Sequence, residues 1–335
     1  MKRIAKITVA LLLAVAMCFS LAGCYDEDLN WSAKYDDTEL PAGAYIYYLS
    51  IAYNEAASKV STEDKVLKCE IDGTPAETWI KNRADEYVNQ YFYIQNEMKR
   101  LGLEMTDEDY STCLQTTESY WNYFGTSFEK FGIAKTSFDI AYSQYNRMYL
   151  KVFNALYGEG GENEVPESEL RQHIEDDYYD YEYFSAPLTK TDDDNKSVDL
   201  TDEEKADLKE TLEKYKTKIE SGAMTVNDAA TDYALKVQQD STYQTGIKDE
   251  NGMQSSYMPD AFISAIKEMN EGDVEVVEST KYMIVLHRLP IKDDEDTLLE
   301  SSDNRSQLLL ELKNTEYADA VSAAAQSFEG VEWNQ

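Results

Sequence analysis

Few residues of this chain allow the backbone to turn sharply, and this scarcity constrains the fold most. The 335 residues contain only 14 glycines and 6 prolines. A barrel or sandwich of many short strands needs more turn residues, so long helices with a small amount of sheet are favoured. Hydrophobic residues make up 42% of the chain and include 26 tyrosines, which excludes a wholly disordered chain. The length fits one large domain or two modest ones.

The composition is also strongly acidic. The chain has 65 Asp+Glu against 31 Lys+Arg, which gives a formal net charge of −34. Nucleic-acid binding depends on cations that neutralise phosphates and release counterions, and an acidic surface repels phosphates instead. We therefore expect no nucleic-acid partner.

The N-terminus has the pattern of a targeting segment. Lys2, Arg3 and Lys6 precede an uncharged stretch at 7–22, which is shorter than the ~20 apolar residues of a membrane-spanning helix. The stretch ends in Leu-Ala-Gly-Cys at 21–24, which resembles the lipobox of bacterial lipoproteins. The resemblance implies a signal peptide at 1–23 and a lipid on Cys24. The alternative is an uncleaved membrane helix with a chance cysteine.

A lipid on Cys24 would hold the protein on the extracytoplasmic face of the cell membrane. Several acyl carbons suffice, since each buried CH₂ contributes roughly 0.8 kcal/mol. Residues 24–40 are polar and are expected to form a tether between the lipid and the folded part.

Two further cysteines lie in the folded part. Outside the cytoplasm Cys69 and Cys113 could form a disulfide, or they could be two separate buried thiols, and the sequence leaves both alternatives open. The sequence has no Cys-x-x-Cys pair and no His/Cys cluster with ligand spacing. Neither a metal nor a cofactor is expected.

The region 41–160 is expected to be a helical domain. Apolar and aromatic residues recur at helical spacing in 43–57 and 75–101. Thr106 and Asp109 form a variant of the capping box that starts a helix at 107, and Phe124-Gly125 is expected to end it at 123. Another helix should run from 137 to 157, and the glycines of 158–161 indicate a linker.

The region 161–290 mixes helices with a few strands. A helix is expected at 166–180, and Thr201 with Glu204 is a full capping box that starts a second helix at 202. Strands, helices and a closing pair of strands are expected in the order β-α-α-α-β-β, at 181–188, 202–220, 225–235, 259–269, 274–277 and 281–286. The stretch 239–257 is expected to be a loop.

The remaining region, 291–335, holds an amphipathic helix at 297–328 that is expected to pack back on the helical domain. The fold class is therefore α+β, with a mainly helical part and a small antiparallel sheet.

This order of elements resembles a known family. The β-α-α-α-β-β order with Met258-Pro-Asp-Ala-Phe262 resembles the parvulin (PpiC-type rotamase) domain, and GLEMTDEDY at 102–110 with 165–185 resembles the chaperone arm of PrsA and SurA foldases. The resemblance covers about 40–290. It implies a helical arm beside a small sheet wrapped by helices, a foldase that binds unfolded or secreted polypeptides, and prolyl isomerisation.

The resemblance also implies a proline pocket, and this chain departs from the family there. Met258 and Phe262 match the pocket's Met and Phe, and Tyr183 falls in the strand that carries the first histidine of the family. Met283 holds the position of the second histidine. The chain has only two histidines, His173 and His287, and neither is at a family position. We therefore name no catalytic residue and expect prolyl isomerase activity to be weak or lost.

The aromatic content of the helical region suggests a second kind of site, because it exceeds what one helix stripe can bury. The residues are Tyr45, Tyr47, Tyr48, Tyr53, Tyr87, Tyr91, Tyr93, Trp121, Tyr123, Phe124, Tyr142, Tyr145, Tyr149 and Phe153. They either pack inside the domain or form a cradle for unfolded segments, whose weak contacts would suit a chaperone. Two other functions remain open: a solute-binding lipoprotein, and a structural or assembly lipoprotein with one dedicated partner.

Overall fold

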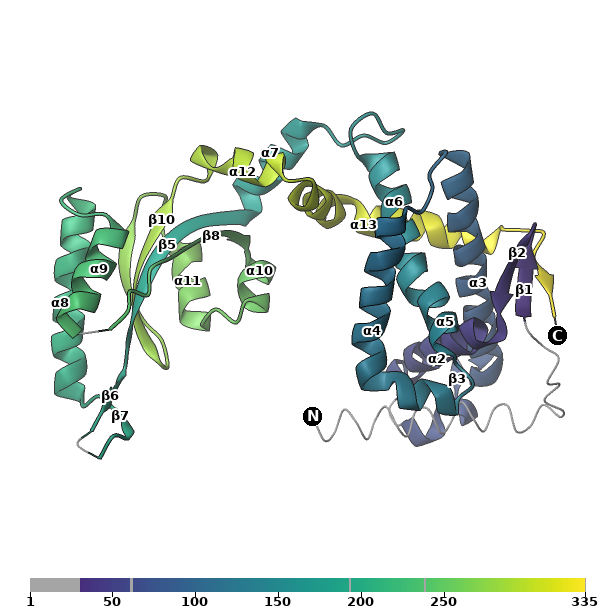
Figure 1. The fold of residues 1–335 in the computed structure, drawn as a ribbon, viewed down its shortest axis with the longest axis horizontal. Helices are drawn as coiled ribbons and strands as arrows, with labels where there is room; N and C mark the ends of the chain where they lie inside the picture. The colour runs from purple at the N-terminus through teal and green to yellow at the C-terminus, as the bar shows by residue number, and fades with distance from the viewer. Residues whose placement is uncertain (1–30, 61–62, 193, 238, 335) are drawn as a thin grey trace. The chain divides into compact units, whose positions relative to one another are not determined.

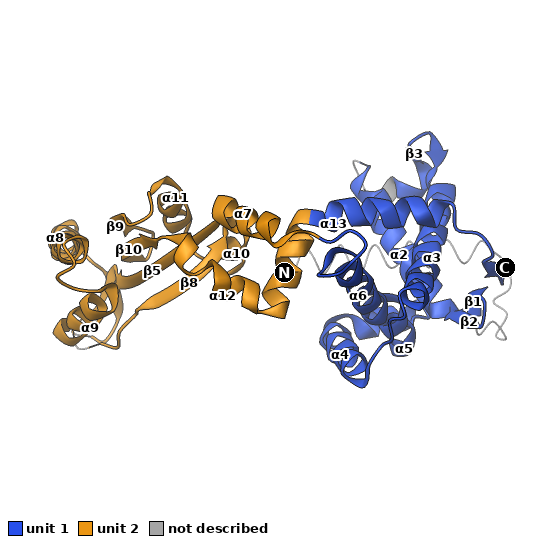
Figure 2. Cartoon of the chain, turned by 90° about the horizontal axis from the view of Figure 1, so that it is seen from above, with its two compact units in different colours: residues 1–164, 313–335 blue, residues 165–312 orange. Residues whose placement is uncertain are grey.

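The computed structural model describes residues 31–60, 63–192, 194–237 and 239–334. The predicted signal peptide and Cys24 lie outside the described residues. The chain divides into two compact units (Figure 2). Unit 1 comprises the chain up to Glu164 together with the chain from Lys313, and unit 2 comprises Val165–Leu312.

Unit 1 is mainly helical (Figure 1). Its elements up to residue 157 are α2 (Ala42–Ser58), η1 (Glu63–Lys68), the short strands β3 (Glu70–Ile71) and β4 (Thr74–Pro75), α3 (Ala76–Arg100), α4 (Asp107–Lys130), α5 (Lys135–Phe138), the π-helix η2 (Asp139–Gln144) and α6 (Tyr145–Tyr157). Alanines with no exposed surface, among them Ala44, Ala52 and Ala84, let α2 and α3 approach closely.

The predicted start of α4 is confirmed, and its predicted end is wrong. The side chains of Thr106 and Asp109 cap each other's backbone N–H groups, as a capping box requires. The helix continues through Phe124-Gly125 to Lys130. Gly125 is needed there because Trp121 folds back over it: a Cβ at position 125 would lie 2.6 Å from Trp121 Cδ1. The glycine therefore makes room for an indole and does not end the helix.

The predicted tether overlaps a small sheet. β1 (Trp31–Tyr35), β2 (Thr38–Pro41) and β11 (Glu332–Trp333) form a three-stranded antiparallel sheet in the order β11-β1-β2. Ala33 and Leu40 have no exposed surface. Residues 31–40 are thus part of unit 1, which corrects the prediction that the tether extends to 40. Each strand is too short for an alternating pattern to stand out in the sequence.

Unit 2 is built on a four-stranded antiparallel sheet in the order β8-β5-β10-β9. The strands are β5 (Tyr178–Pro187), β8 (Gln244–Asp249), β9 (Val274–Glu278) and β10 (Tyr282–Leu289), and β6 (Thr189–Thr191) pairs with β7 (Ser197–Asp199) in a separate hairpin. The predicted α+β class is confirmed. The sheet has one strand more than expected, because β8 occupies part of the predicted loop 239–257.

Helices cover both faces of this sheet (Figure 1). The helices of unit 2 are α7 (Glu167–Asp177), α8 (Asp202–Glu220), α9 (Val226–Val237), α10 (Glu250–Ser255), α11 (Asp260–Glu268), η3 (Ile291–Asp293) and α12 (Glu295–Glu300). Because successive side chains of a strand point to opposite faces, β10 serves two cores. Met283 and Val285 pack with α8 and α9, whereas Ile284 and Leu286 pack with α11.

The predicted helix at 297–328 is divided at Ser301 into α12 and α13 (Ser302–Gln326). The first part of α13 belongs to unit 2 and the part from Lys313 belongs to unit 1. Within unit 1, the ring centroids of Tyr317 and Tyr149 are 4.6 Å apart. None of the helices in the described residues has the length and apolar composition needed to span a membrane.

Candidate functional site

Three of the four predicted pocket residues meet on one face of the unit 2 sheet. Phe262 on α11 has no exposed surface, and its ring centroid lies 5.2 Å from those of Tyr181 and Tyr183. Met258 packs at the margin of the same cluster and is half-buried. Phe262 is therefore a core residue of unit 2, and only Met258 and Tyr183 remain partly accessible.

Met283 does not share that face, which corrects the prediction of a single pocket. It is buried with Phe184 and Val285 against α8 and α9. Tyr183 and Phe262 belong to the cluster on the opposite side. The cause is the alternation of a strand: Met283 stands opposite Ala186 in the register, an odd number of residues from Tyr183.

The two histidines do not supply the missing catalytic pair. His287 stands two residues beyond Val285 on β10, so it shares the face of Met283, opposite Phe262. Its Nδ1 lies 2.9 Å from Glu182 Oε1, and Tyr243 donates a hydrogen bond to Glu182 Oε2 at 2.9 Å. Burial raises the pKa of Glu182, but the hydrogen bonds from His287 and Tyr243 outweigh it and lower that pKa.

His173 lies on α7, with its ring nitrogens 2.8 Å from Asp177 Oδ2 and 3.0 Å from Glu311 Oε2. On the Phe262 face, burial raises the pKa of Tyr183, so its hydroxyl stays protonated at neutral pH. This face is a packed cluster whose partly accessible members include Tyr179, Tyr183 and Met258, and the cluster contains no imidazole.

The cysteines are separate thiols in the structure. Cys113 is buried on α4, and its Sγ lies 3.5 Å from the backbone oxygen of Ser143. Cys69 precedes β3, and its sulfur is not bonded to that of Cys113. Of the two alternatives left open by the sequence, the structure has the one without a disulfide.

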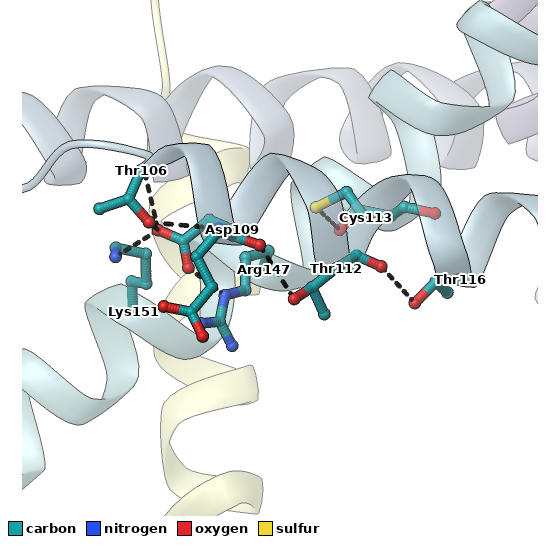
Figure 3. Close-up of polar contacts among 9 residues, drawn as sticks. Thr106, Asp109, Thr112, Cys113, Thr116, Arg147 and Lys151 are labelled. Atoms are coloured by element: carbon teal, nitrogen blue, oxygen red, sulfur yellow. Dashed lines mark hydrogen bonds and ion pairs between the residues drawn. The ribbon is translucent and has the colours of Figure 1, made fainter.

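The fully buried positions of α4 are unusual because they carry polar or small residues. They are Asp109, Cys113, Thr117 and Gly125. Asp109, only 1% exposed, accepts hydrogen bonds from Arg147 at 2.5 Å and from Lys151 at 2.7 Å (Figure 3). Burial alone would raise the pKa of Asp109, but Lys151, the Thr106 backbone N–H and Arg147 hold it well below its usual range. A buried carboxylate with two cations thus joins α4 to α6.

A second polar group continues this interface. Thr117 Oγ1 lies 2.7 Å from Asp139 Oδ1 and 2.7 Å from Ser143 Oγ, both on the π-helix η2. Gln144 also donates to Asp139, at 2.6 Å. π-helical turns are rare and occur often at functional sites. From the sequence, only the capping box indicated this interface, and its partners on η2 and α6 could not be predicted.

Helix α4 also carries large apolar residues that are partly exposed. Tyr123 is 85% exposed, and Leu114, Tyr110, Tyr120 and Phe124 are each exposed by between 39% and 56%. We call the C-terminal group of rings the α4 aromatic surface and define it as Tyr120, Trp121, Tyr123, Phe124 and Phe128. Sequence reasoning singled out Trp121, Tyr123 and Phe124 but missed Tyr120.

A packed layer of rings supports the α4 aromatic surface. Phe138 is 1% exposed and stacks on both Phe128 and Tyr142, with ring centroids 5.2 Å apart in each pair. Tyr142 donates a hydrogen bond to the hydroxyl of Tyr120 at 2.8 Å. Burial, with the hydrogen bond to Tyr120, raises the pKa of Tyr142 to about 12. The α4 aromatic surface therefore rests on packed rings, and the Tyr142 hydroxyl beneath it stays protonated at neutral pH.

Much of the remaining aromatic set packs inside unit 1. Tyr47, Tyr48, Tyr53, Tyr91 and Phe153 are buried. Internal packing is thus the correct interpretation for these residues, and the most exposed members of the predicted cradle, Tyr123 and Phe124, lie on α4.

Unit 1 also has a cavity of about 320 Å³, lined by Glu55, Lys59, Trp79, Asn82, Arg83 and Glu86. Arg83 lies 2.8 Å from both Glu55 and Glu86, so the charges in this cavity largely neutralise one another.

Comparison with known proteins gives structural likeness only. No family model matches the chain, and no curated protein is significantly similar to it. Among solved structures, foldase protein PrsA from Streptococcus pneumoniae is 13% identical with a TM-score of 0.39, covering 77% of this chain and 92% of that one. PrsA from Lactococcus lactis is 13% identical with a TM-score of 0.37, covering 91% and 94%.

PrsA from Bacillus subtilis is 15% identical to this chain with a TM-score of 0.33, covering 79% of this chain and 92% of that one. All three similar structures are PrsA foldases, the family that the sequence resembles.

Proposed function

We propose that this chain is a lipid-anchored extracytoplasmic chaperone of the foldase type, which binds unfolded or newly secreted polypeptides on the α4 aromatic surface. We propose further that its rotamase-like unit 2 has weak or no prolyl isomerase activity. The observation that carries the proposal is the exposure of large aromatic side chains in the C-terminal part of α4, a helix whose fully buried positions hold Asp109, Cys113, Thr117 and Gly125.

Exposing aromatic side chains costs stability, and this supports a binding role. Leaving an apolar side chain in water forfeits roughly 1.5–3 kcal/mol relative to burying it. The partial exposure of Tyr123, Phe124 and Tyr120 means that part of this burial free energy is not gained in the described structure. An unfolded segment that covers these rings recovers this free energy. Because packed rings such as Phe138 support the surface, binding costs little side-chain entropy there. Shallow contacts of this kind tolerate many sequences.

The sequence and the first strand together support the proposed anchor. Residues 25–30 separate the predicted lipid-bearing Cys24 from β1, which begins at Trp31. A fully extended chain of that length spans at most about 20 Å. The tether we propose is therefore short, and it would keep unit 1 close to the membrane, where secreted chains emerge unfolded.

Weak or absent isomerisation follows from the Phe262 face. Rotation about a prolyl bond has to overcome a barrier of about 18–20 kcal/mol, and stabilising the twisted amide needs oriented polar groups. That face offers the Tyr183 hydroxyl, while His287 lies on the opposite face of the sheet. In a cis/trans exchange assay on a proline peptide we expect a rate near the uncatalysed one, unchanged in Met258→Ala. Fast exchange that Met258→Ala abolishes would contradict this.

The chaperone proposal is tested by aggregation of a denatured basic client diluted into an equimolar amount of the protein. Light scattering should fall with the wild type and rise again with the double variant Tyr123→Ser/Phe124→Ser. The matched control is Tyr257→Ser, which removes a tyrosine that is 94% exposed in unit 2. It should suppress aggregation like the wild type. If the wild type leaves scattering unchanged, or if the double variant protects equally well, the proposal is wrong.

A further inference from the structure

The exposed rings of the α4 aromatic surface lack a partner that other rings of this chain have. Arg83 lies 4.7 Å from the ring centroid of Tyr87, and Lys236 lies 5.1 Å from that of Tyr215. In the part of the chain that the structure describes, no lysine or arginine is placed over Tyr120, Trp121, Tyr123 or Phe124. Of these rings, Tyr123 is 85% exposed and accessible to a cation from outside, and Trp121, which packs on Phe128 and Phe138, is partly accessible.

The internal pairs also show what such a cation needs. In each pair a carboxylate also binds the cation: Arg83 forms an ion pair with Glu55 at 2.8 Å, and Lys236 forms one with Asp232 at 2.7 Å. Ring face and carboxylate together hold the cation, because the ring attracts it through its quadrupole and the carboxylate through its charge.

The α4 aromatic surface has carboxylates in the corresponding places. Glu118 precedes Trp121 by three residues, and Glu129 follows Gly125 by four, so both lie on the helix face over which the indole folds. Glu118 is paired with Lys135. Glu129 is exposed, and within the described residues no cation forms an ion pair with it. Lys130 is the only cation of α4 itself.

From this arrangement we infer that the α4 aromatic surface selects segments in which an arginine or lysine stands next to an aromatic or aliphatic residue. The inference rests on the proposed function and names its client class. The apolar residue covers rings such as Phe124. The cation stacks on Trp121 and reaches Glu129, or it stacks on the exposed ring of Tyr123. Arginine fits best, since its planar guanidinium stacks on a ring and still donates hydrogen bonds from its edge. The net charge of −34 attracts the same segments from a distance.

The test compares two labelled peptides that differ only in the central residue, which is arginine in one and its neutral isostere citrulline in the other. A leucine-phenylalanine pair stands on each side of that residue. Affinities are measured by fluorescence anisotropy with the full chain in nanodiscs of zwitterionic lipid. Cation–ring contacts at exposed sites predict about 2- to 5-fold tighter binding of the arginine peptide. The ratio of the two affinities should become smaller in 0.5 M NaCl, because salt screens exposed charges.

Variants locate the preference. Tyr123→Leu keeps an apolar side chain but removes the ring, and Glu129→Gln removes the charge from an exposed side chain. Each should reduce the arginine preference, whereas Tyr257→Leu in unit 2 should leave it unchanged. Equal binding of both peptides to the wild type overturns the inference while the proposed function stands. A preference unaffected by Tyr123→Leu and Glu129→Gln overturns it too. Failure of the wild type to bind either peptide counts against the proposed function itself.

Discussion

Helix α4 in unit 1 and the sheet of unit 2 differ in the exposure of their aromatic side chains. Phe184 of the sheet and Phe262 of α11, which packs on the sheet, have no exposed surface. The helix buries Asp109 and Thr117 and exposes Tyr123. Large apolar side chains inside a protein mostly serve stability, and the same side chains gathered on the surface mostly mark an interaction site. The comparison therefore separates the residues that hold this fold from those that we propose bind clients.

The largest effect is expected at Phe262. Removing its ring leaves a cavity between α11 and the sheet, so Phe262→Ala should lower the free energy of unfolding by about 3–5 kcal/mol. Urea denaturation followed by circular dichroism measures this. A loss below about 1 kcal/mol would mean that Phe262 lines an open pocket instead of a core. Because of this cost, Phe262→Ala is a poor probe of isomerase activity, and Met258→Ala is the better one.

A smaller effect is expected at the polar interface of α4. Asp109→Asn leaves Arg147 and Lys151 without their carboxylate and weakens the capping box with Thr106. We expect a loss of about 1–3 kcal/mol in the free energy of unfolding. Thr112→Ala, which removes an exposed hydroxyl of the same helix, is the control and should change it little.

The same carboxylate predicts a pH dependence with a definite sign. The pKa of Asp109 in the folded state lies below its unfolded value of about 3.9. Its contribution to stability is therefore present above that value and is lost as the pH falls through the folded pKa. The difference in urea midpoint between wild type and Asp109→Asn should be full at pH 6 and shrink towards pH 3. A difference that grows on acidification would contradict the assignment.

The smallest effect on stability is expected at Gly125. A methyl group there meets Trp121 at 2.6 Å and must displace the indole, while alanine adds roughly 1 kcal/mol of helix propensity. We expect Gly125→Ala to change the free energy of unfolding by less than about 1 kcal/mol but to weaken binding of the arginine peptide. The control is Gly102→Ala, a glycine outside α4 whose backbone φ is +65° and which should affect stability only. If Gly125→Ala binds the arginine peptide as tightly as the wild type does, Trp121 is not part of the binding site.

The two regions also differ in how far the sequence predicts them. The helices and the inner strands β5 and β10 follow from apolar periodicity and capping residues such as Thr201 and Glu204, whose capping box is confirmed. β8 was missed because it is a polar edge strand with no fully buried residue. The prediction of one pocket was wrong at Met283. Its position in β10 decides which face of the sheet it lies on, and this register is known only once the pairing with β5 is known.

The burial along α4 could not be predicted from its own sequence. Asp109 and Thr117 are residue types typical of exposed positions, and Phe124, seven residues after Thr117 on the same face, is typical of a buried one. Distant residues decide the outcome: Arg147, Lys151 and Asp139 satisfy the polar side chains, so that Asp109 and Thr117 are buried while Phe124 is 39% exposed. No spacing rule within 107–130 reveals those partners.

The most direct measurement of the central claim is site-specific photocrosslinking. A benzophenone amino acid replaces Tyr123 in one preparation of the full chain and Tyr257 in another, two tyrosines that are 85% and 94% exposed in units 1 and 2. Each is irradiated with an unfolded basic client and with the same client in its native state. The account predicts crosslinks from position 123 to the unfolded client and few from position 257. Equal labelling at both positions, or labelling only at 257, would contradict it.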